Sequence, residues 1–270
     1  MRTPSRFALA ACIALGAPCA LAEPAAEAIV QVASRSGVTI SYLLRSDASA
    51  APKAVAVLFP GGDGLLNLRQ EGAALRFEYP GNFLVRARAL LQDTEVGIAV
   101  IDVPSELLRR GYSDAFRQSG EHAADVAAVV ADLRGRFRGA KVYLVGTSRG
   151  TVSAAYAARR LGAAIDGVVL TSTVFIGSRG GTGLSGFDFG DIRAPLLLVH
   201  HAEDGCSVTP YRSAEALAPK YPLVTVRGGL PARSGPCEAR AAHGYLGKEA
   251  ETMAAIRNWM LGRPYPARID

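Results

Sequence analysis

The chain has 270 residues, of which 49% are hydrophobic and 20% charged, which suits one globular domain with a full core and excludes an intrinsically disordered chain. The net charge of +6 comes from basic residues scattered along the sequence without long runs. This pattern indicates a solvated basic surface and argues against a nucleic-acid-binding protein.

The first 22 residues have the features of an export signal. Basic Arg2 and Arg6 precede a short apolar run over residues 7–17, and residues 20–22 (Ala-Leu-Ala) match a cleavage site. The sequence therefore predicts a signal peptide over residues 1–22. The protein is expected to be exported, periplasmic or secreted, with no membrane span after cleavage. Two alternatives are an uncleaved anchor helix and a lipoprotein modified at Cys12.

The rest of the chain alternates strands with helices. Residues 23–37 are expected to form an N-terminal leader, followed by a single domain over residues 38–270. Predicted strands are residues 39–44 (at an edge), 54–59, 96–103, 142–145, 165–171, 195–200 and 223–226. Predicted helices are residues 83–91, 121–137, 151–160, 214–217 and 248–261. This alternation predicts an α/β fold, with a mostly parallel central sheet and helices on both faces.

A G-x-S-x-G motif, Gly-Thr-Ser-Arg-Gly over residues 146–150, joins a predicted strand to a predicted helix. A strand that turns directly into a helix forces the middle residue into strained backbone geometry, and the flanking glycines leave room for the turn. Ser148 then lies at the helix N-terminus, where the helix dipole favours developing negative charge. The alternative is that Ser148 only caps the helix.

Acid and base candidates follow this motif in the order Ser, Asp, His, so the chain from about residue 38 onward resembles the α/β-hydrolase superfamily. A serine nucleophile needs a base, and the base needs an orienting acid. The resemblance assigns these roles to His243, before the last predicted helix, and Asp204, after the strand at 195–200. Glu203 and Asp188 are alternative acids.

The same resemblance implies an oxyanion hole made of two backbone amides. One belongs to Arg149, directly after the nucleophile, and the other to Gly62, after the strand at 54–59, with Asp63 as the next possibility. The Arg149 side chain is expected in a surface salt bridge rather than on an acidic substrate.

The Gly-rich stretch over residues 173–192 lies where members of this superfamily often carry a helical cap. It has no helical periodicity, so a minimal cap and an open site are expected. Phe175, Phe187 and Phe189 either line an acyl or alcohol pocket or seal the core beneath a loop; the pattern does not decide between them.

Four cysteines are present, and two of them, Cys12 and Cys19, leave with the predicted signal. Cys206 and Cys237 remain in a chain expected in an oxidising compartment, on the loops that carry the acid and base candidates. They are predicted to form a disulfide. The alternative is two separate buried thiols.

The four histidines are His122, His200, His201 and His243. The adjacent pair His200 and His201 invites a metal interpretation, but neighbours on a strand point to opposite faces. No metal-binding motif is present, so no metal site is predicted. His122 has no assigned role.

Together these residues predict a serine hydrolase that cleaves a small carboxylic ester through an acyl-enzyme intermediate and needs no cofactor. The short cap is similar to that of dienelactone hydrolase-like members, although their usual nucleophile is cysteine. One alternative is an exported peptidase or amidase, which needs an anchor for a peptide terminus. Another is a noncatalytic binding protein on a hydrolase scaffold. The oligomeric state is not readable from the sequence.

Overall fold

The computed structural model describes residues 26–47 and 51–270, so the predicted signal peptide lies outside the described residues. Within these ranges, no helix is both long enough and apolar enough to cross a membrane.

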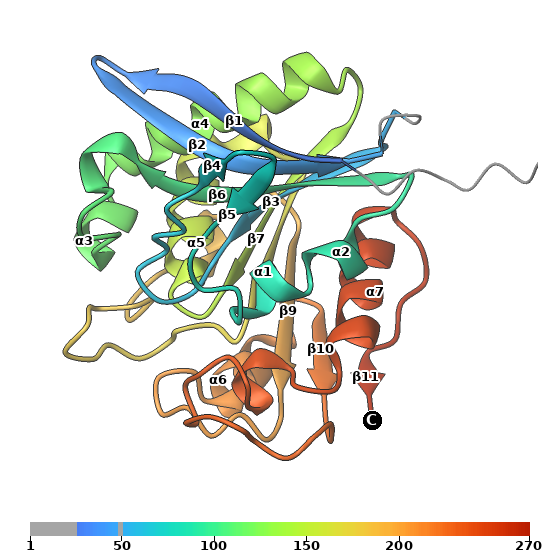
Figure 1. The fold of residues 1–270 in the computed structure, drawn as a ribbon. Coiled ribbons are helices and arrows are strands. Elements are labelled where there is room, and N and C mark those ends of the chain that lie inside the picture. Colours follow the sequence, from blue (N-terminus) through green and yellow to red (C-terminus); the bar gives the residue numbers. More distant parts are fainter. Residues whose placement is uncertain (1–25, 48–50) are drawn as a thin grey trace, which may run out of the picture.

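A nine-stranded sheet forms the centre of the described chain, in the order β1-β2-β6-β3-β7-β8-β9-β10-β11 (Figure 1). Its strands are β1 (Ala26–Arg35), β2 (Val38–Ser46), β3 (Ala54–Phe59), β6 (Val96–Pro104), β7 (Lys141–Thr147), β8 (Gly167–Thr171), β9 (Leu196–His201), β10 (Leu223–Val226) and β11 (Arg268–Ile269). β2 pairs antiparallel with both of its neighbours, and every other pair in this sheet is parallel. A separate hairpin contains β4 (Arg69–Glu71) and β5 (Ala74–Arg76).

Helices cover both faces of this sheet. One face packs against α4 (Gly120–Arg136) and α5 (Gly150–Leu161), and the other against α1 (Phe83–Arg86), α2 (Arg88–Leu91) and α7 (Glu249–Met260). Alternate residues of β3 show this division, because Val57 lies in the first core cluster and Leu58 in the second. Short helices α3 (Asp114–Arg117) and α6 (Tyr211–Leu217) complete the set.

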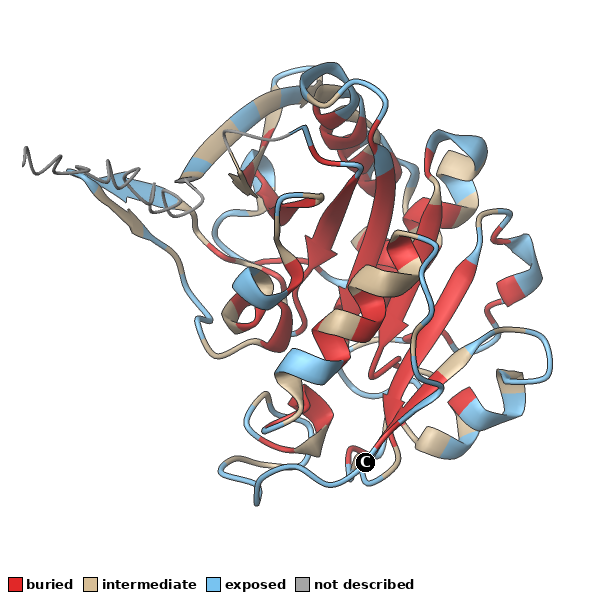
Figure 2. Ribbon diagram, turned by 90° about the vertical axis from the view of Figure 1, so that its right-hand side faces the viewer, coloured by how far each residue is buried: buried red, intermediate tan, exposed pale blue. Residues whose placement is uncertain are grey.

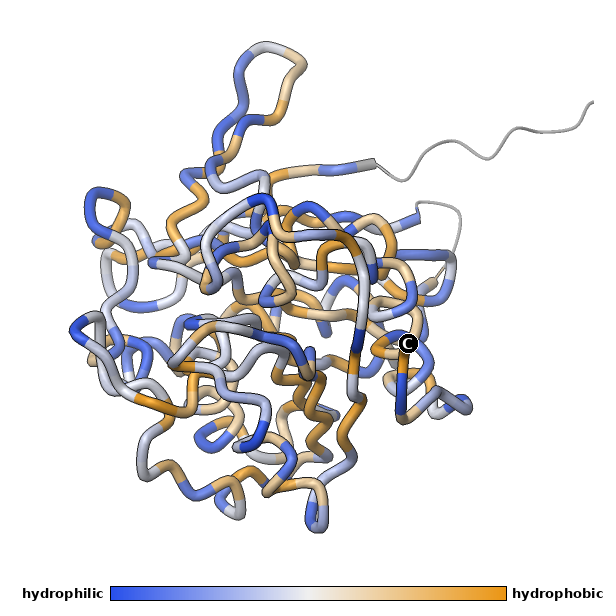
Figure 3. Tube along the Cα trace, turned by 90° about the horizontal axis from the view of Figure 1, so that it is seen from below, coloured by the Kyte–Doolittle hydropathy of each residue, from blue (hydrophilic) through white to orange (hydrophobic). Residues whose placement is uncertain are grey.

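Burial follows the same layers. Figure 2 shows the central strands as buried along their whole length, and Figure 3 shows hydrophilic residues prevailing at the outlying turns. Every residue of β3 and β6 is buried. β3 is a continuous apolar run and β6 is apolar apart from the buried Asp102, as expected where helices cover both faces of a sheet.

The expected leader over residues 23–37 is wrong for the part that the structure describes. Ala26–Arg35 forms β1, which pairs with β2 through a tight turn at Gly37, whose φ is +70°. Val30 and Val32 pack against one core cluster and Ile29 against the other. The sheet therefore begins at Ala26 rather than at residue 38, and β1 replaces β2 as the edge strand.

The other predicted elements are present. The strands at 54–59 and 223–226 have the predicted bounds, and the helix at 83–91 is divided at Ala87 into α1 and α2. The sequence analysis missed β4, β5, α3 and β11. No α-helix forms in residues 173–192, which matches the predicted minimal cap. Phe187 and Phe189 are buried in the first core cluster and Phe175 packs against it, so these rings seal the core.

Candidate active site

Ser148 lies on a sharp turn between β7 and α5, with a φ of +51°. Its amide donates to the carbonyl of Thr171 on the neighbouring strand at 3.1 Å. A Cβ atom at Gly146 would come within 2.5 Å of the Gly150 carbonyl oxygen, and one at Gly150 within 2.1 Å of the Phe59 carbonyl oxygen. The two glycines of the motif are therefore required by close backbone packing. Arg149 is the N-cap of α5, and no side chain caps this helix, so Ser148 is not a capping residue.

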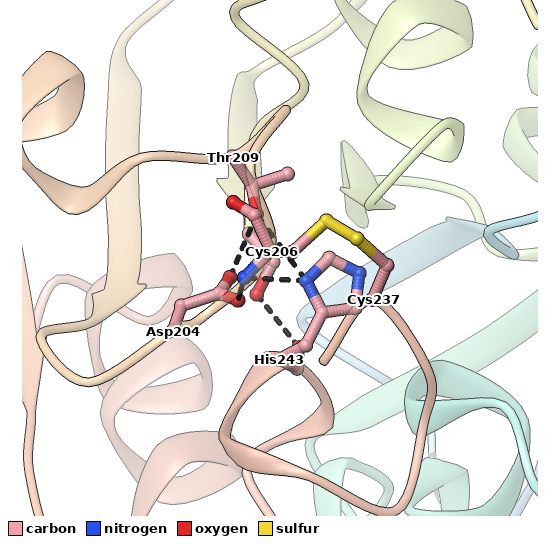
Figure 4. The surroundings of a disulfide bond; sticks show 6 residues. Asp204, Cys206, Thr209, Cys237 and His243 are labelled. Atoms are coloured by element: carbon pink, nitrogen blue, oxygen red, sulfur yellow. Dashed lines mark hydrogen bonds and ion pairs between the residues drawn. A yellow bond between two sulfur atoms is a disulfide. The ribbon is translucent and has the colours of Figure 1, made fainter. Parts of the chain in front are cut away.

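His243 and Asp204 are in direct contact, with Nδ1 and Oδ2 3.0 Å apart (Figure 4). Both side chains are buried, at 4% and 0% exposure. Asp204 follows β9, and His243 lies in a short turn before α7. The alternative acids lie elsewhere: Glu203 accepts from the Gly228 amide, and the Asp188 side chain accepts from the Gly190 amide.

Further donors fix the Asp204 carboxylate. The Cys206 amide donates to Oδ1 at 3.0 Å, and the Thr209 hydroxyl donates to Oδ2 at 2.8 Å. A carboxylate only accepts hydrogen bonds, so the neutral His243 ring carries its proton on Nδ1 and leaves Nε2 as a base. Among the described residues, this buried Nε2 has no hydrogen-bond partner.

Ser148 and His243 line one open pocket of about 450 Å³. Its walls come from the loop after β3, the turn before α1, the Ser148 turn and the loop that precedes His243. The lining residues are Gly61, Gly62, Tyr79, Gly81, Asn82, Phe83, Thr147, Ser148, Ser234, Cys237, Glu238, Ala239, Arg240, His243 and Gly244.

The predicted disulfide between Cys206 and Cys237 is present, with an S–S distance of 2.05 Å and a sequence separation of 31 (Figure 4). Cys206 belongs to the Asp204 loop, and Cys237 lines the pocket. The bond therefore joins the loop of the candidate acid to a pocket wall.

Of the two candidate oxyanion donors, Arg149 directly follows Ser148 in the chain and Gly62 lines the same pocket as Ser148. Gly62 lines the pocket with a φ of +65°, whereas Asp63 does not line it. Neither the Gly62 nor the Arg149 amide donates to a backbone acceptor in the described part of the chain. The Arg149 side chain forms the predicted salt bridge, with Asp114 at 2.7 Å, and also donates to the Gly180 carbonyl at 2.8 Å.

The sequence analysis did not identify Arg117, whose side chain contacts the backbone of the candidate oxyanion donor Gly62. Its side chain is buried, donates from Nη2 to the Gly62 carbonyl at 2.9 Å and from Nη1 to the Ser153 hydroxyl at 2.6 Å, and lies 4.8 Å from the Tyr112 ring centroid. It forms no ion pair with a carboxylate among the described residues. Burial lowers the pKa of Arg117 to about 10, so the guanidinium stays charged at neutral pH.

Strained backbone gathers around the pocket. Non-glycine residues with positive φ in the described chain are Asn67, Tyr79, Ser148, Ser172 and Tyr245. The Ser172 hydroxyl donates to the His243 carbonyl at 2.8 Å, and the Ser172 amide donates to the Tyr245 hydroxyl at 3.0 Å. Tyr79 lines the pocket itself. Such conformations persist only where the surroundings enforce them, and they cluster at functional sites.

The adjacent histidines His200 and His201 each form hydrogen bonds with the backbone. His200 Nε2 accepts from the Thr173 amide at 2.7 Å, and burial lowers the pKa of His200 to about 3. His201 Nδ1 accepts from the Glu203 amide at 3.2 Å, and its Nε2 lies 3.0 Å from the Gly228 carbonyl oxygen. Within the described ranges, no group of three or more His, Cys, Asp or Glu residues is arranged to hold a metal ion.

The chain has the α/β-hydrolase fold, as the sequence resemblance implied. Ser148 and His243 line one pocket, and His243 contacts Asp204. Similar solved structures include Est1E from Butyrivibrio proteoclasticus, 16% identical, covering 87% of this chain and 98% of that chain with a TM-score of 0.58. A dienelactone hydrolase from Anabaena variabilis is 16% identical, with coverages of 89% and 99% and a TM-score of 0.59. An α/β serine hydrolase without lid from Xanthomonas campestris is 16% identical, with coverages of 89% and 98% and a TM-score of 0.56. No protein-family model and no curated protein matches the sequence.

Proposed function

We propose that this protein is a serine hydrolase that cleaves small carboxylic esters through an acyl-enzyme intermediate. The observation that carries the proposal is the His243–Asp204 pair, joined at 3.0 Å, because His243 lines the same pocket as Ser148 and its Nε2 has no hydrogen-bond partner among the described residues. This arrangement supplies a nucleophile, a base and an orienting acid in one place.

The reaction has two halves. Ser148 Oγ attacks the ester carbonyl while His243 Nε2 takes the hydroxyl proton, and Asp204 stabilises the imidazolium through Nδ1–H. The C–O bond to the alcohol then breaks, and the departing oxygen takes the proton from His243. In the second half His243 deprotonates a water molecule, which attacks the acyl carbon. The bond from that carbon to Ser148 Oγ then breaks, and Oγ takes the proton back from His243 as the acid is released.

Negative charge on the carbonyl oxygen needs fixed donors. The amides of Gly62 and Arg149 are proposed for this role, because Gly62 lines the pocket, Arg149 directly follows Ser148, and neither amide has a backbone acceptor in the described chain. One such donor contributes about 3–4 kcal/mol to transition-state stabilisation. The serine chemistry needs no cofactor.

The pocket and the structural neighbours support a small ester as the substrate. The pocket volume of about 450 Å³ suits a small molecule, and its walls contain no helical cap. The neighbours include a protein described as a cold-adapted esterase from an Arctic metagenomic library and the dienelactone hydrolase.

Export belongs to the same proposal. The signal pattern over residues 1–22 and the Cys206–Cys237 bond both suit an oxidising compartment outside the cytoplasm. N-terminal sequencing of the protein recovered outside the cytoplasm is expected to begin near Glu23. A mature chain that still contains Arg2 would contradict cleavage.

Fluorophosphonate labelling tests the central claim. The wild type is expected to be labelled, and Ser148→Ala is expected to remain folded and unlabelled. Thr151→Ser is a matched control, since it changes a hydroxyl residue on the same turn but retains its hydrogen bond to the Ser148 carbonyl. Absence of labelling in a folded wild type would favour the binding-scaffold alternative. A parallel panel of esters and amides of the same acid separates an esterase from a peptidase or amidase.

A further inference from the structure

Tyr79 has two unusual properties for a large aromatic residue. The residue is 50% exposed, and its φ of +52° lies in the left-handed region. It also precedes Pro80, and proline further restricts the backbone of the residue before it. A bulky residue in this conformation costs free energy that glycine or asparagine would largely avoid.

Neighbouring groups hold Tyr79 in this conformation. Its carbonyl accepts from the Asn82 amide at 2.9 Å, and its hydroxyl donates to Asp63 Oδ2 at 3.4 Å. Asp63 directly follows Gly62, the candidate oxyanion donor. The nearby Asp63 charge raises the pKa of the Tyr79 phenol, which therefore remains a neutral hydrogen-bond donor.

The rest of the protein provides little packing for the Tyr79 ring. Among the described residues, it forms no aromatic contact, although many of the other aromatic rings do. It lies instead in the wall of the pocket that contains Ser148, together with Phe83. Strain and apolar exposure in one pocket-lining residue indicate that its partner is a ligand rather than the core.

We propose that Tyr79 is a specificity-determining residue whose ring packs against a flat aromatic group of the substrate, so that the preferred substrates are esters carrying an aryl ring. This inference rests on the proposed esterase function and specifies its substrate class. Phe83 also borders the pocket, but it is 1% exposed and packs against Tyr245, so Tyr79 is the aromatic residue that presents its ring to a ligand. Offset or edge-on packing between rings favours a flat aryl group over a puckered alkyl ring of similar size.

Paired substrates test the inference. Phenyl acetate and cyclohexyl acetate compare the alcohol side, and methyl benzoate and methyl cyclohexanecarboxylate compare the acyl side. Each substrate is compared with itself across variants, so its intrinsic reactivity cancels. In Tyr79→Leu we expect kcat/KM to fall roughly three- to tenfold for the aryl member of at least one pair and by less than about twofold for both alkyl members. Tyr79→Phe should retain the aryl preference.

Tyr79→Gly separates ligand recognition from a structural role. Glycine relieves the strained φ, so this variant should unfold at a temperature equal to or above that of the wild type while losing the aryl preference. Asn67→Gly is the matched control, because Asn67 has a φ of +50° and does not line the pocket. It should leave every substrate ratio unchanged.

Two results would overturn the inference: equal losses on aryl and alkyl esters in Tyr79→Leu, or an unchanged aryl preference in Tyr79→Gly. Fluorophosphonate labelling of the same proteins separates failure of this inference from failure of the esterase proposal, because labelling depends on Ser148 and not on the aryl preference. If the wild type is not labelled, NMR titration of Ser148→Ala with phenyl acetate and cyclohexyl acetate still decides the point without turnover. Adding Tyr79→Leu to that variant should weaken only phenyl acetate binding; unchanged phenyl acetate binding would reject the role of Tyr79.

Discussion

Replacing Arg117 by methionine tests whether its buried guanidinium fixes the position of the loop after β3, which carries the candidate oxyanion donor Gly62. Arg117 Nη2 donates to the Gly62 carbonyl at 2.9 Å, so it contacts the loop whose amide is proposed to stabilise the transition state. Methionine is long, flexible and apolar, and it fills much of the space without donating a hydrogen bond. The variant keeps the Gly62 amide and removes only the group that orients it.

The structure sets limits on the loss of activity expected in Arg117→Met. Complete loss of an oxyanion donor costs about 3–4 kcal/mol, and a donor that is present but loosely oriented costs part of that. We therefore expect kcat to fall roughly 10- to 100-fold with KM nearly unchanged, because the interaction forms only in the transition state. Stability should change less: leaving the Gly62 carbonyl and Ser153 hydroxyl unpaired costs about 1–3 kcal/mol each, and removing a buried charge that has no carboxylate partner offsets part of this loss.

Steady-state kinetics give kcat and KM, and urea unfolding of the same preparation gives the free energy of unfolding. Ser153→Ala is the control, because it removes the other hydrogen-bond partner of Arg117 without touching the Gly62 loop. That control should lose less than about threefold in kcat, a small effect by comparison with a lost transition-state donor. A folded Arg117→Met protein with wild-type kcat would refute the positioning role, and so would a loss expressed only in KM.

Two further predictions concern the disulfide and a core histidine. Cys206→Ser combined with Cys237→Ser should lower the free energy of unfolding by about 3–4 kcal/mol, from loop-closure entropy over a separation of 31 residues, and should also lower kcat. Urea unfolding under oxidising and reducing conditions checks this, and unchanged stability on reduction of the wild type would contradict it. Burial lowers the pKa of His122 to about 3, so the unfolded chain protonates first as the pH falls below about 6.5, and stability is lost progressively from there toward pH 3. His122→Leu should remove roughly 2 kcal/mol of the stability lost between pH 7 and pH 5; the same pH slope in this variant would exclude His122 as its source.

The sequence could predict the parts of the fold that local pattern determines. The strand at 54–59 is apolar at every position because both of its faces are covered, and Gly146 and Gly150 are needed by local backbone packing around Ser148. The Cys206–Cys237 pairing was also predictable, since only these two cysteines follow the signal pattern.

The missed features depend on tertiary contacts. The residues of β1 resemble an Ala-rich leader because they are only partly buried. They become a strand by pairing with β2, after the chain turns at Gly37. Arg117 resembles any surface arginine in the sequence, and its burial becomes visible only when α3 packs against α5. The strained φ of Tyr79 has no local signal either, because its neighbours in sequence are not those of a left-handed turn residue.

The contacts that hold the pocket walls in place bear on the fate of the proposed acyl-enzyme. Three ties join pocket walls to other parts of the protein: Arg117 to Gly62, the Cys206–Cys237 bond, and Arg86, which donates to the Gly81 carbonyl at 2.9 Å and the Gly244 carbonyl at 2.6 Å. The walls are thus fixed without a helical cap. An uncapped pocket admits water to the acyl carbon throughout the cycle, whereas transfer to another alcohol requires water to be excluded. In the proposed mechanism, we therefore expect hydrolysis rather than transfer to another alcohol.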